Sequence, residues 1–225
     1  MKYFSAAVSL LLTFFFFSFT DMNKTTRVVF FGDSITEAAV EPGGYIVQMR
    51  EMLAAEGKSS DYDLIGAGVG GNKVYDLYLR LEKDVLEKKP DVVAIYVGVN
   101  DVWHKRLYGT GTDADKFGRF YEALISKMRD AGIRVILCTP ACIGEKTDCT
   151  NTQDGELNQY AQIIRDLAEA YHCSLCDFRT AFQQYNTGHN PENKEKGILT
   201  TDGVHLNDAG NQLVAGMLLK KIREN

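Results

Sequence analysis

Short apolar segments alternate along this chain with longer segments in which apolar residues recur every three or four positions. Runs of four to eight residues rich in β-branched and aromatic side chains predict strands. They cover Val28–Phe31, Asp61–Ile65, Asp91–Val97, Ile133–Cys138 and Ser174–Phe178. The run Asp91–Val97 is the most continuous, as expected of a parallel strand that is buried on both faces.

The segments between these strands predict helices, because their apolar residues fall on one face and a Gly or Pro follows several of them. They are Tyr45–Ala55, Val74–Lys88, Lys116–Ala131, Gly155–Tyr171, Arg179–Tyr185 and Asn207–Ile222. Such alternation predicts a three-layer α/β/α sandwich around a five-stranded parallel sheet of flavodoxin-like order. The segment after Gly98, with Trp103, His104 and Tyr108, is predicted to be a loop.

Composition narrows the class of protein. The chain has 225 residues, of which 45% are hydrophobic, enough for one domain with a sizeable core. Its formal net charge is -5, and no cluster of Lys and Arg stands out. Because binding to a phosphate backbone requires such a cluster, nucleic acid is not expected as a partner.

The first twenty residues differ from the rest. Lys2 precedes an apolar run that includes Leu10–Leu12 and Phe14–Phe17, and Ser18-Phe-Thr20 offers small residues for cleavage. This pattern predicts a signal peptide over residues 1–20, a domain over 21–225 and a periplasmic or extracellular location. The alternative is an uncleaved membrane anchor, although the run is shorter than the ~20 residues that span a bilayer. With no cysteine there, lipid attachment through an N-terminal Cys is excluded.

Five cysteines follow later in the chain, at Cys138, Cys142, Cys149, Cys173 and Cys176. In an oxidising compartment an odd number leaves at least one without a partner in the chain. Cys142 and Cys149 bracket a polar loop and are the favoured bridge, with the pairing otherwise open. The pair Cys173 and Cys176 leads into a strand rather than a helix, which favours a structural role. No second cluster has metal-ligand spacing, so no metal site is predicted.

The residues with catalytic chemistry lie after the strands and before the last helix. Gly32-Asp33-Ser34 ends the first strand, glycines crowd Gly66–Gly71, and Gly98-Val-Asn100-Asp101 and Asp202-Gly-Val-His205 follow. The carboxyl ends of parallel strands form the ligand-binding edge of such sheets. Ser34 is therefore a candidate nucleophile that needs a base.

Together, in this order, these four segments resemble the motif blocks of the SGNH hydrolases, also called GDSL-type esterases and lipases. The resemblance spans nearly all of the chain after its first twenty residues. It implies the SGNH hydrolase fold and a serine esterase that forms an acyl-enzyme, with neither metal nor organic cofactor.

The resemblance also implies site roles. Ser34, His205 and Asp202 would form the catalytic triad, in which His205 takes the hydroxyl proton and Asp202 orients its ring. The backbone amides of Ser34 and Gly71 and the side-chain amide of Asn100 would form the oxyanion hole. The adjacent Gly70 is an alternative register, and Gly66 stands where the family often has Asn. Asp33 is predicted to be a structural hydrogen-bonding residue.

A small, acidic, exported domain with no long apolar lid predicts a short-acyl ester as the substrate. The resemblance implies that this ester is an acetyl ester of a carbohydrate. The alternatives are a lipase or lysophospholipase, an O-acyltransferase that uses the same acyl-enzyme and, ranked low, a non-catalytic binding domain. Trp103 and Tyr108 are predicted to line the substrate pocket, with ordinary packing as the alternative. His104, His172 and His189 are expected at the surface or in the core, and the oligomeric state is left open.

Overall fold

The computed structural model describes residues 24–224, so the predicted signal peptide lies outside the described residues. Five parallel strands form one sheet in the order β2-β1-β3-β4-β5, which confirms the flavodoxin-like order. The strands are β1 Thr26–Gly32, β2 Tyr62–Gly68, β3 Val92–Tyr96, β4 Arg134–Cys138 and β5 Ser174–Cys176. Central β1 pairs with both neighbours, so that Val28 lies between Leu64 and Val92.

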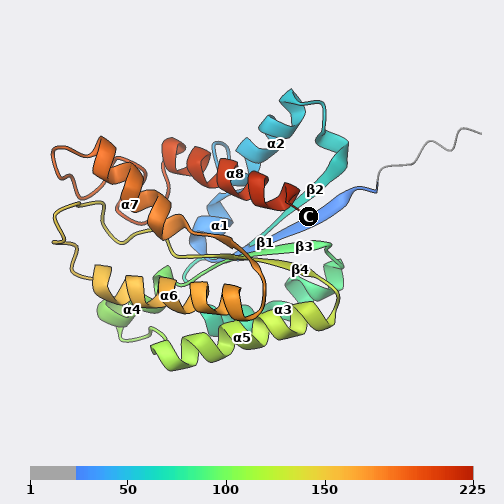
Figure 1. Cartoon of the computed structure of the whole chain (residues 1–225), viewed down its shortest axis with the longest axis horizontal. Helices are drawn as coiled ribbons and strands as arrows, with labels where there is room; N and C mark the ends of the chain where they lie inside the picture. Colours follow the sequence, from blue (N-terminus) through green and yellow to red (C-terminus); the bar gives the residue numbers. More distant parts are fainter. Residues whose placement is uncertain (1–23, 225) are drawn as a thin grey trace, which may run out of the picture.

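Helices cover both faces of the sheet, which confirms the three-layer sandwich (Figure 1). One face carries α1 Ser34–Ala38, α2 Tyr45–Ala55, α7 Phe178–His189 and α8 Asp208–Arg223. The other carries α3 Val74–Asp84, α5 Ala114–Asp130 and α6 Asp154–Ala170, with α4 Val99–Tyr108 at the carboxyl end of the strands. Two 3-10 turns, η1 Ser59–Asp61 and η2 Leu86–Lys88, complete the described elements. None of the helices between residues 24 and 224 is long and apolar enough to cross a membrane.

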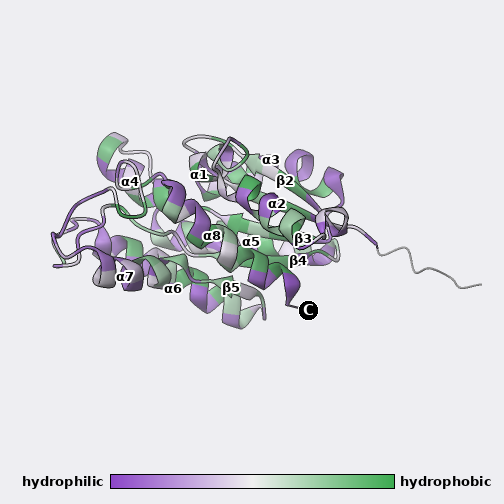
Figure 2. Cartoon of the chain, turned by 90° about the horizontal axis from the view of Figure 1, so that it is seen from above, coloured by the Kyte–Doolittle hydropathy of each residue, from purple (hydrophilic) through white to green (hydrophobic). Residues whose placement is uncertain are grey.

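Alternate residues of each strand enter opposite halves of the core. In β1, Val28 and Phe30 pack toward α2 and α8, whereas Val29 and Phe31 pack toward α3 and α5. All four side chains are almost completely buried, and full burial of such a side chain contributes about 1.5–3 kcal/mol. The apolar interior and the hydrophilic outer turns of the helices are visible in Figure 2. Burial on both faces explains why the central strands β1, β3 and β4 are continuous apolar runs.

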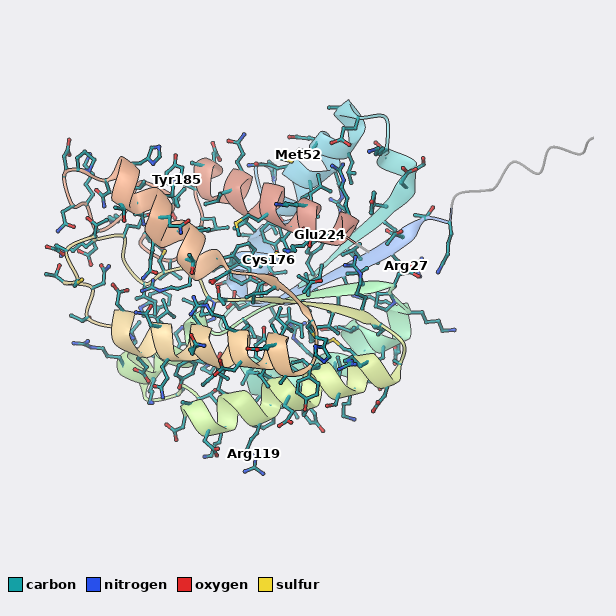
Figure 3. The ribbon with its side chains drawn as sticks, viewed as in Figure 1. Arg27, Met52, Arg119, Cys176, Tyr185 and Glu224 are labelled. Atoms are coloured by element: carbon teal, nitrogen blue, oxygen red, sulfur yellow. The ribbon has the colours of Figure 1, made fainter. Side chains whose placement is uncertain are left out.

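The end of the sheet opposite the carboxyl ends of the strands is closed by Arg134, at the start of β4. Its guanidinium donates hydrogen bonds to the carbonyls of Lys221 (3.2 Å), Ile222 (2.6 Å) and Glu224 (2.9 Å). Glu224 lies just past the end of α8 (Figure 3). These bonds satisfy carbonyls that a helix end leaves without partners.

The predicted loop after Gly98 is wrong, because Val99–Tyr108 forms α4. Gly98, at a φ of 132°, turns the chain out of β3, and Gly109, at a φ of 68°, ends the helix in the left-handed region. Val99, Val102, Trp103 and Leu107 have helical spacing, but only the first turn of α4 is buried and its second half is exposed. The helix is short and lies between Gly98 and the glycine-rich segment Gly109–Thr112, which favoured the loop prediction.

Other predicted ends of helices and strands differ from the observed ends by a few residues. The predicted helix Val74–Lys88 divides into α3 and the turn η2, and β2 continues to Gly68. The predicted strand Ser174–Phe178 ends at Cys176, because Asp177 caps α7 by accepting the backbone N–H of Thr180.

The favoured Cys142–Cys149 bridge is also wrong, since all five cysteines are free. Cys142 is buried, with its sulfur 3.6 Å from the carbonyl oxygen of Gly203, whereas Cys149 is exposed. The polar loop between them therefore does not bring the two thiols together.

Candidate active site

Ser34 lies at a sharp turn between β1 and α1. Asp33 caps the helix, because its Oδ1 accepts the backbone N–H of Ile35 at 3.1 Å. A Cβ at Gly32 would lie 2.3 Å from the hydroxyl of Thr36 and 2.4 Å from the carbonyl of Tyr96, so only glycine fits there. The turn leaves Ser34 partly exposed at the carboxyl end of the sheet. As predicted, Asp33 is a structural hydrogen-bonding residue.

The structure brings Ser34, His205 and Asp202 together in a row. The Oγ of Ser34 lies 2.9 Å from Nε2 of His205, and Nδ1 of His205 lies 2.7 Å from Oδ2 of Asp202. Oδ1 of Asp202 also accepts the backbone N–H groups of Val204 (2.9 Å) and His205 (2.8 Å). With the Nδ1 proton directed to Asp202, Nε2 of His205 is free to accept the Ser34 hydroxyl.

The charge of Asp202 is maintained by these hydrogen bonds. Partial burial works against ionisation, but the bonds from the His205 side chain and from the backbone N–H groups outweigh it. The pKa of Asp202 is therefore below its ordinary value. An ionised Asp202 can stabilise the imidazolium that forms when His205 takes a proton.

The loop after β2 lies against Ser34. A Cβ at Gly70 would be 4.0 Å from the Cβ of Ser34 and 2.9 Å from the carboxylate of Glu37. Gly71 has a φ of 74°, which favours glycine. Asn100 is buried and donates one Nδ2 hydrogen to the carbonyl of Asn72 at 3.1 Å. Its second amide hydrogen remains available to an oxyanion.

Arg80 joins this loop to the two strands beside it, and sequence reasoning missed it. Its guanidinium donates to the carbonyls of Gly32 (2.6 Å) and Ala67 (3.0 Å), at the ends of β1 and β2. It also donates to the side-chain oxygen of Asn72 at 2.7 Å and forms an ion pair with Asp84 at 2.7 Å. One largely buried group therefore fixes the loop after β2 relative to the strand that carries Ser34.

Two further interactions hold the same loop. Lys73 is buried, and its ammonium group donates to the carbonyl of Gly71 at 3.1 Å. The Asp101 carboxylate accepts the backbone N–H of Val74, at 3.2 and 3.3 Å. Burial raises the pKa of Asp101 to about 7 despite its hydrogen bonds and the nearby Lys73. The segment from Gly71 to Val74 is thus anchored at successive backbone groups.

The aromatic residues predicted to line the pocket lie on α4. The ring of Trp103 is 6.2 Å from that of His205, while Tyr108 is exposed at the far end of the helix. His104 lies between them and also faces Gly71, whose added Cβ would be 3.8 Å from its ring. Burial and the charge of Lys73 lower the pKa of His104. Because this segment was predicted as a loop, the place of His104 beside Gly71 was not predicted.

The other two histidines outside the triad, His172 and His189, lie in other parts of the structure. His189 stacks on Tyr185 of α7 at 4.0 Å, and its Nδ1 lies 2.8 Å from the carbonyl of Tyr185. His172 lies in the turn that follows α6. Within residues 24–224, no group of three His, Cys, Asp or Glu side chains could hold a metal ion.

Comparison with known proteins gives consistent matches. Residues 30–213 match the model of the GDSL-like lipase/acylhydrolase family. A solved structure of an acetyl xylan esterase, AlAXEase, is 59% identical with a TM-score of 0.85, and the match covers 86% of this chain and 98% of that chain. The acetylxylan esterase of Geobacillus stearothermophilus is 28% identical over 218 residues, 87% of this chain and 93% of that protein. Uncharacterized lipoprotein YqeF of Bacillus subtilis (strain 168) is 27% identical over 173 residues, 68% of this chain and 70% of that protein.

Replacement of Arg80 by lysine tests whether its guanidinium positions the loop. A lysine cannot reach two carbonyls and Asn72 at once, so the loop should shift relative to Ser34. We expect kcat for p-nitrophenyl acetate to fall about 10- to 100-fold, as small misplacements do, with little change in KM.

Arg134→Lys is the matched control, since Arg134 also binds backbone carbonyls but at the opposite end of the sheet. It should lower the melting temperature and leave kcat unchanged. Equal losses of kcat in the two variants would show that Arg80 acts only through stability.

The buried Asp33 makes stability depend on pH. Burial, aided by the charge of Asp101, raises its pKa from 3.8 to about 7, despite the hydrogen bond from Ile35 and the nearby His205. As pH rises from about 4 to 7, the unfolded chain releases this proton before the folded protein does, so the free energy of unfolding falls.

Asp33→Asn keeps the capping oxygen and removes the titration. As the pH rises from about 4 to 7, we expect the free energy of unfolding of the variant to increase relative to that of the wild type. The expected change is a few kcal/mol, since one pKa unit corresponds to about 1.4 kcal/mol. Urea denaturation at pH 5, 6, 7 and 8 measures it, and parallel curves for the two proteins would contradict the prediction.

Proposed function

The chain belongs to the GDSL-like lipase/acylhydrolase family and is a carboxylic ester hydrolase, and we propose that it removes acetyl groups from a carbohydrate through an acyl-enzyme on Ser34. The observation that carries this proposal is the row of Ser34, His205 and Asp202, with contacts of 2.9 and 2.7 Å. It occurs in a chain 59% identical to an acetyl xylan esterase.

In the proposed reaction, the Oγ of Ser34 attacks the acetyl carbonyl carbon while Nε2 of His205 takes the hydroxyl proton. The tetrahedral intermediate places its negative oxygen among the N–H groups of Ser34 and Gly71 and the side-chain amide of Asn100. A single donor of this kind contributes about 2.7–4 kcal/mol to a reaction barrier.

Collapse of the intermediate breaks the bond to the sugar oxygen, which receives the proton from His205. Water then attacks the acetyl-enzyme, with His205 again as the base and Asp202 as its charged partner. Acetate and the free serine hydroxyl are the products, and no cofactor enters any step.

The surroundings of Ser34 support a small acyl group and a hydroxyl-rich leaving group. Glu37 lies beside Gly70, and His104 lies beside Gly71, so polar side chains flank the nucleophile on the side of the β2 loop. A long alkyl chain would instead favour apolar walls there. An acetylated xylan is the substrate that the named relatives suggest.

Variants of the three aligned residues test the proposal. We expect Ser34→Ala and His205→Ala to lower kcat for release of acetate from acetylated xylan by more than about 10³-fold, and Asp202→Asn to lower it less or equally. Ser60→Ala, at an exposed serine near the opposite end of the sheet, is the matched control and should retain full activity.

Two outcomes would contradict the proposal. Equal activity of Ser34→Ala and the wild type would remove Ser34 as the nucleophile. A preference of the wild type for p-nitrophenyl esters of long fatty acids over the acetate would instead support a lipase or lysophospholipase. An assay with an added acceptor sugar distinguishes hydrolysis from acyl transfer. Free acetate is the product of hydrolysis, whereas an acetylated acceptor is the product of acyl transfer.

Export is part of the proposed function, because a polymeric carbohydrate is met outside the cell. The charged and apolar pattern of residues 1–20 supports a signal peptide, and a lipoprotein is among the relatives. Expression of the full chain in a bacterium should yield a mature domain that begins at Asp21, as intact mass would measure. A full-length product in the membrane fraction would show an anchor instead.

A further inference from the structure

A row of aromatic rings leads away from His205 along α4. The ring of Trp103 lies 6.2 Å from that of His205, the ring of His104 is 5.6 Å from Trp103, and that of Tyr108 is 5.0 Å from His104. All three aromatic residues belong to one helix, which extends from the buried Asn100 to solvent at Tyr108. At 1.5 Å per residue, that distance is about 12 Å, longer than a single sugar ring.

The chemistry of the site places the leaving group near the first ring of this row. His205 must protonate the departing sugar oxygen, so that oxygen lies beside Nε2 of His205. Trp103 is the aromatic neighbour of His205, with the two rings edge to face at 68°. Trp103 is therefore within reach of a sugar attached to the departing oxygen, and a sugar chain that followed α4 would reach Tyr108.

The far end of the row is open to solvent. Tyr108 has 68% of its surface exposed, and the adjacent Leu107 has 51%. The exposed ring of Tyr108 is therefore accessible to a ligand. An aromatic ring with a polar tip suits a ligand that presents both apolar C–H faces and hydroxyl groups.

We propose that Trp103, His104 and Tyr108 form an oligosaccharide subsite, in which Trp103 contacts the acetylated sugar and Tyr108 stacks on a sugar farther along the same chain. The proposal rests on the proposed function and adds to it a preference for chain length. The row of rings makes the enzyme more efficient on acetylated oligosaccharides than on an acetylated single sugar.

Tyr108 is the residue to test, because its exposure allows substitution without loss of the fold. We expect Tyr108→Ala to lower kcat/KM for acetylated xylotetraose about three- to tenfold, the range expected for one aromatic contact. Activity on p-nitrophenyl acetate and on acetylated xylose should not change. Tyr108→Phe keeps the ring and should retain the activity on the tetraose, whereas Leu107→Ala is the exposed matched control and should behave as the wild type.

The outcomes separate this proposal from the proposed function. If the wild type cleaves acetylated xylose and xylotetraose but Tyr108→Ala cleaves both as well as the wild type does, the subsite is wrong and the esterase assignment stands. An equal fall on all three substrates would also contradict the subsite, since it would show a general disturbance. If the wild type cleaves p-nitrophenyl acetate and neither sugar ester, the carbohydrate function fails and the subsite fails with it.

Discussion

The hydrogen bonds of Arg80 are the interaction on which the geometry of the site depends. Ser34, Gly71 and Asn100 come after three different strands. A parallel sheet places the ends of those strands at the same edge, but it does not by itself fix the positions of the residues that follow them. Arg80 ties the ends of β1 and β2 and the side chain of Asn72 to one rigid guanidinium group. Asn100 then binds the carbonyl of Asn72, which connects the third strand to the same loop. The hydrogen bonds of Arg80 and Asn100 thus fix the loop after β2 relative to the ends of β1 and β3. Their effect is a defined arrangement of Ser34, Gly71 and Asn100 at the edge of the sheet.

Much of this molecule could be predicted from local sequence. The central strands β1, β3 and β4 are buried on both faces, so they are visible as apolar runs. Asp202 and His205 are close because only two residues separate them. The pairing of Ser34 with His205 spans 171 positions and followed only from motif order and the family resemblance. Their catalytic roles stay a prediction, as does the choice of Gly71 over Gly70.

The rest depended on contacts between distant segments. Arg80 lies on an ordinary amphipathic helix, and nothing in its neighbourhood shows that its partners are Gly32 and Ala67. The short helix α4 lies between Gly98 and Gly109 and was predicted as a loop, so the place of His104 beside Gly71 was missed. Cys142 is buried under Gly203 rather than paired with Cys149, a choice set by tertiary packing that cysteine spacing does not reveal.

The proposed active site requires that the ends of β1, β2 and β3 converge on one oxyanion beside Ser34. The most direct test is a crystal structure of the protein after reaction with a p-nitrophenyl methylphosphonate, which leaves a tetrahedral phosphorus on the nucleophile. We expect a bond from phosphorus to the Oγ of Ser34. We also expect a phosphonyl oxygen within hydrogen-bond distance of the N–H groups of Ser34 and Gly71 and of the Asn100 amide. Phosphorus on another residue, or an oxygen that faces solvent away from Gly71 and Asn100, would contradict it.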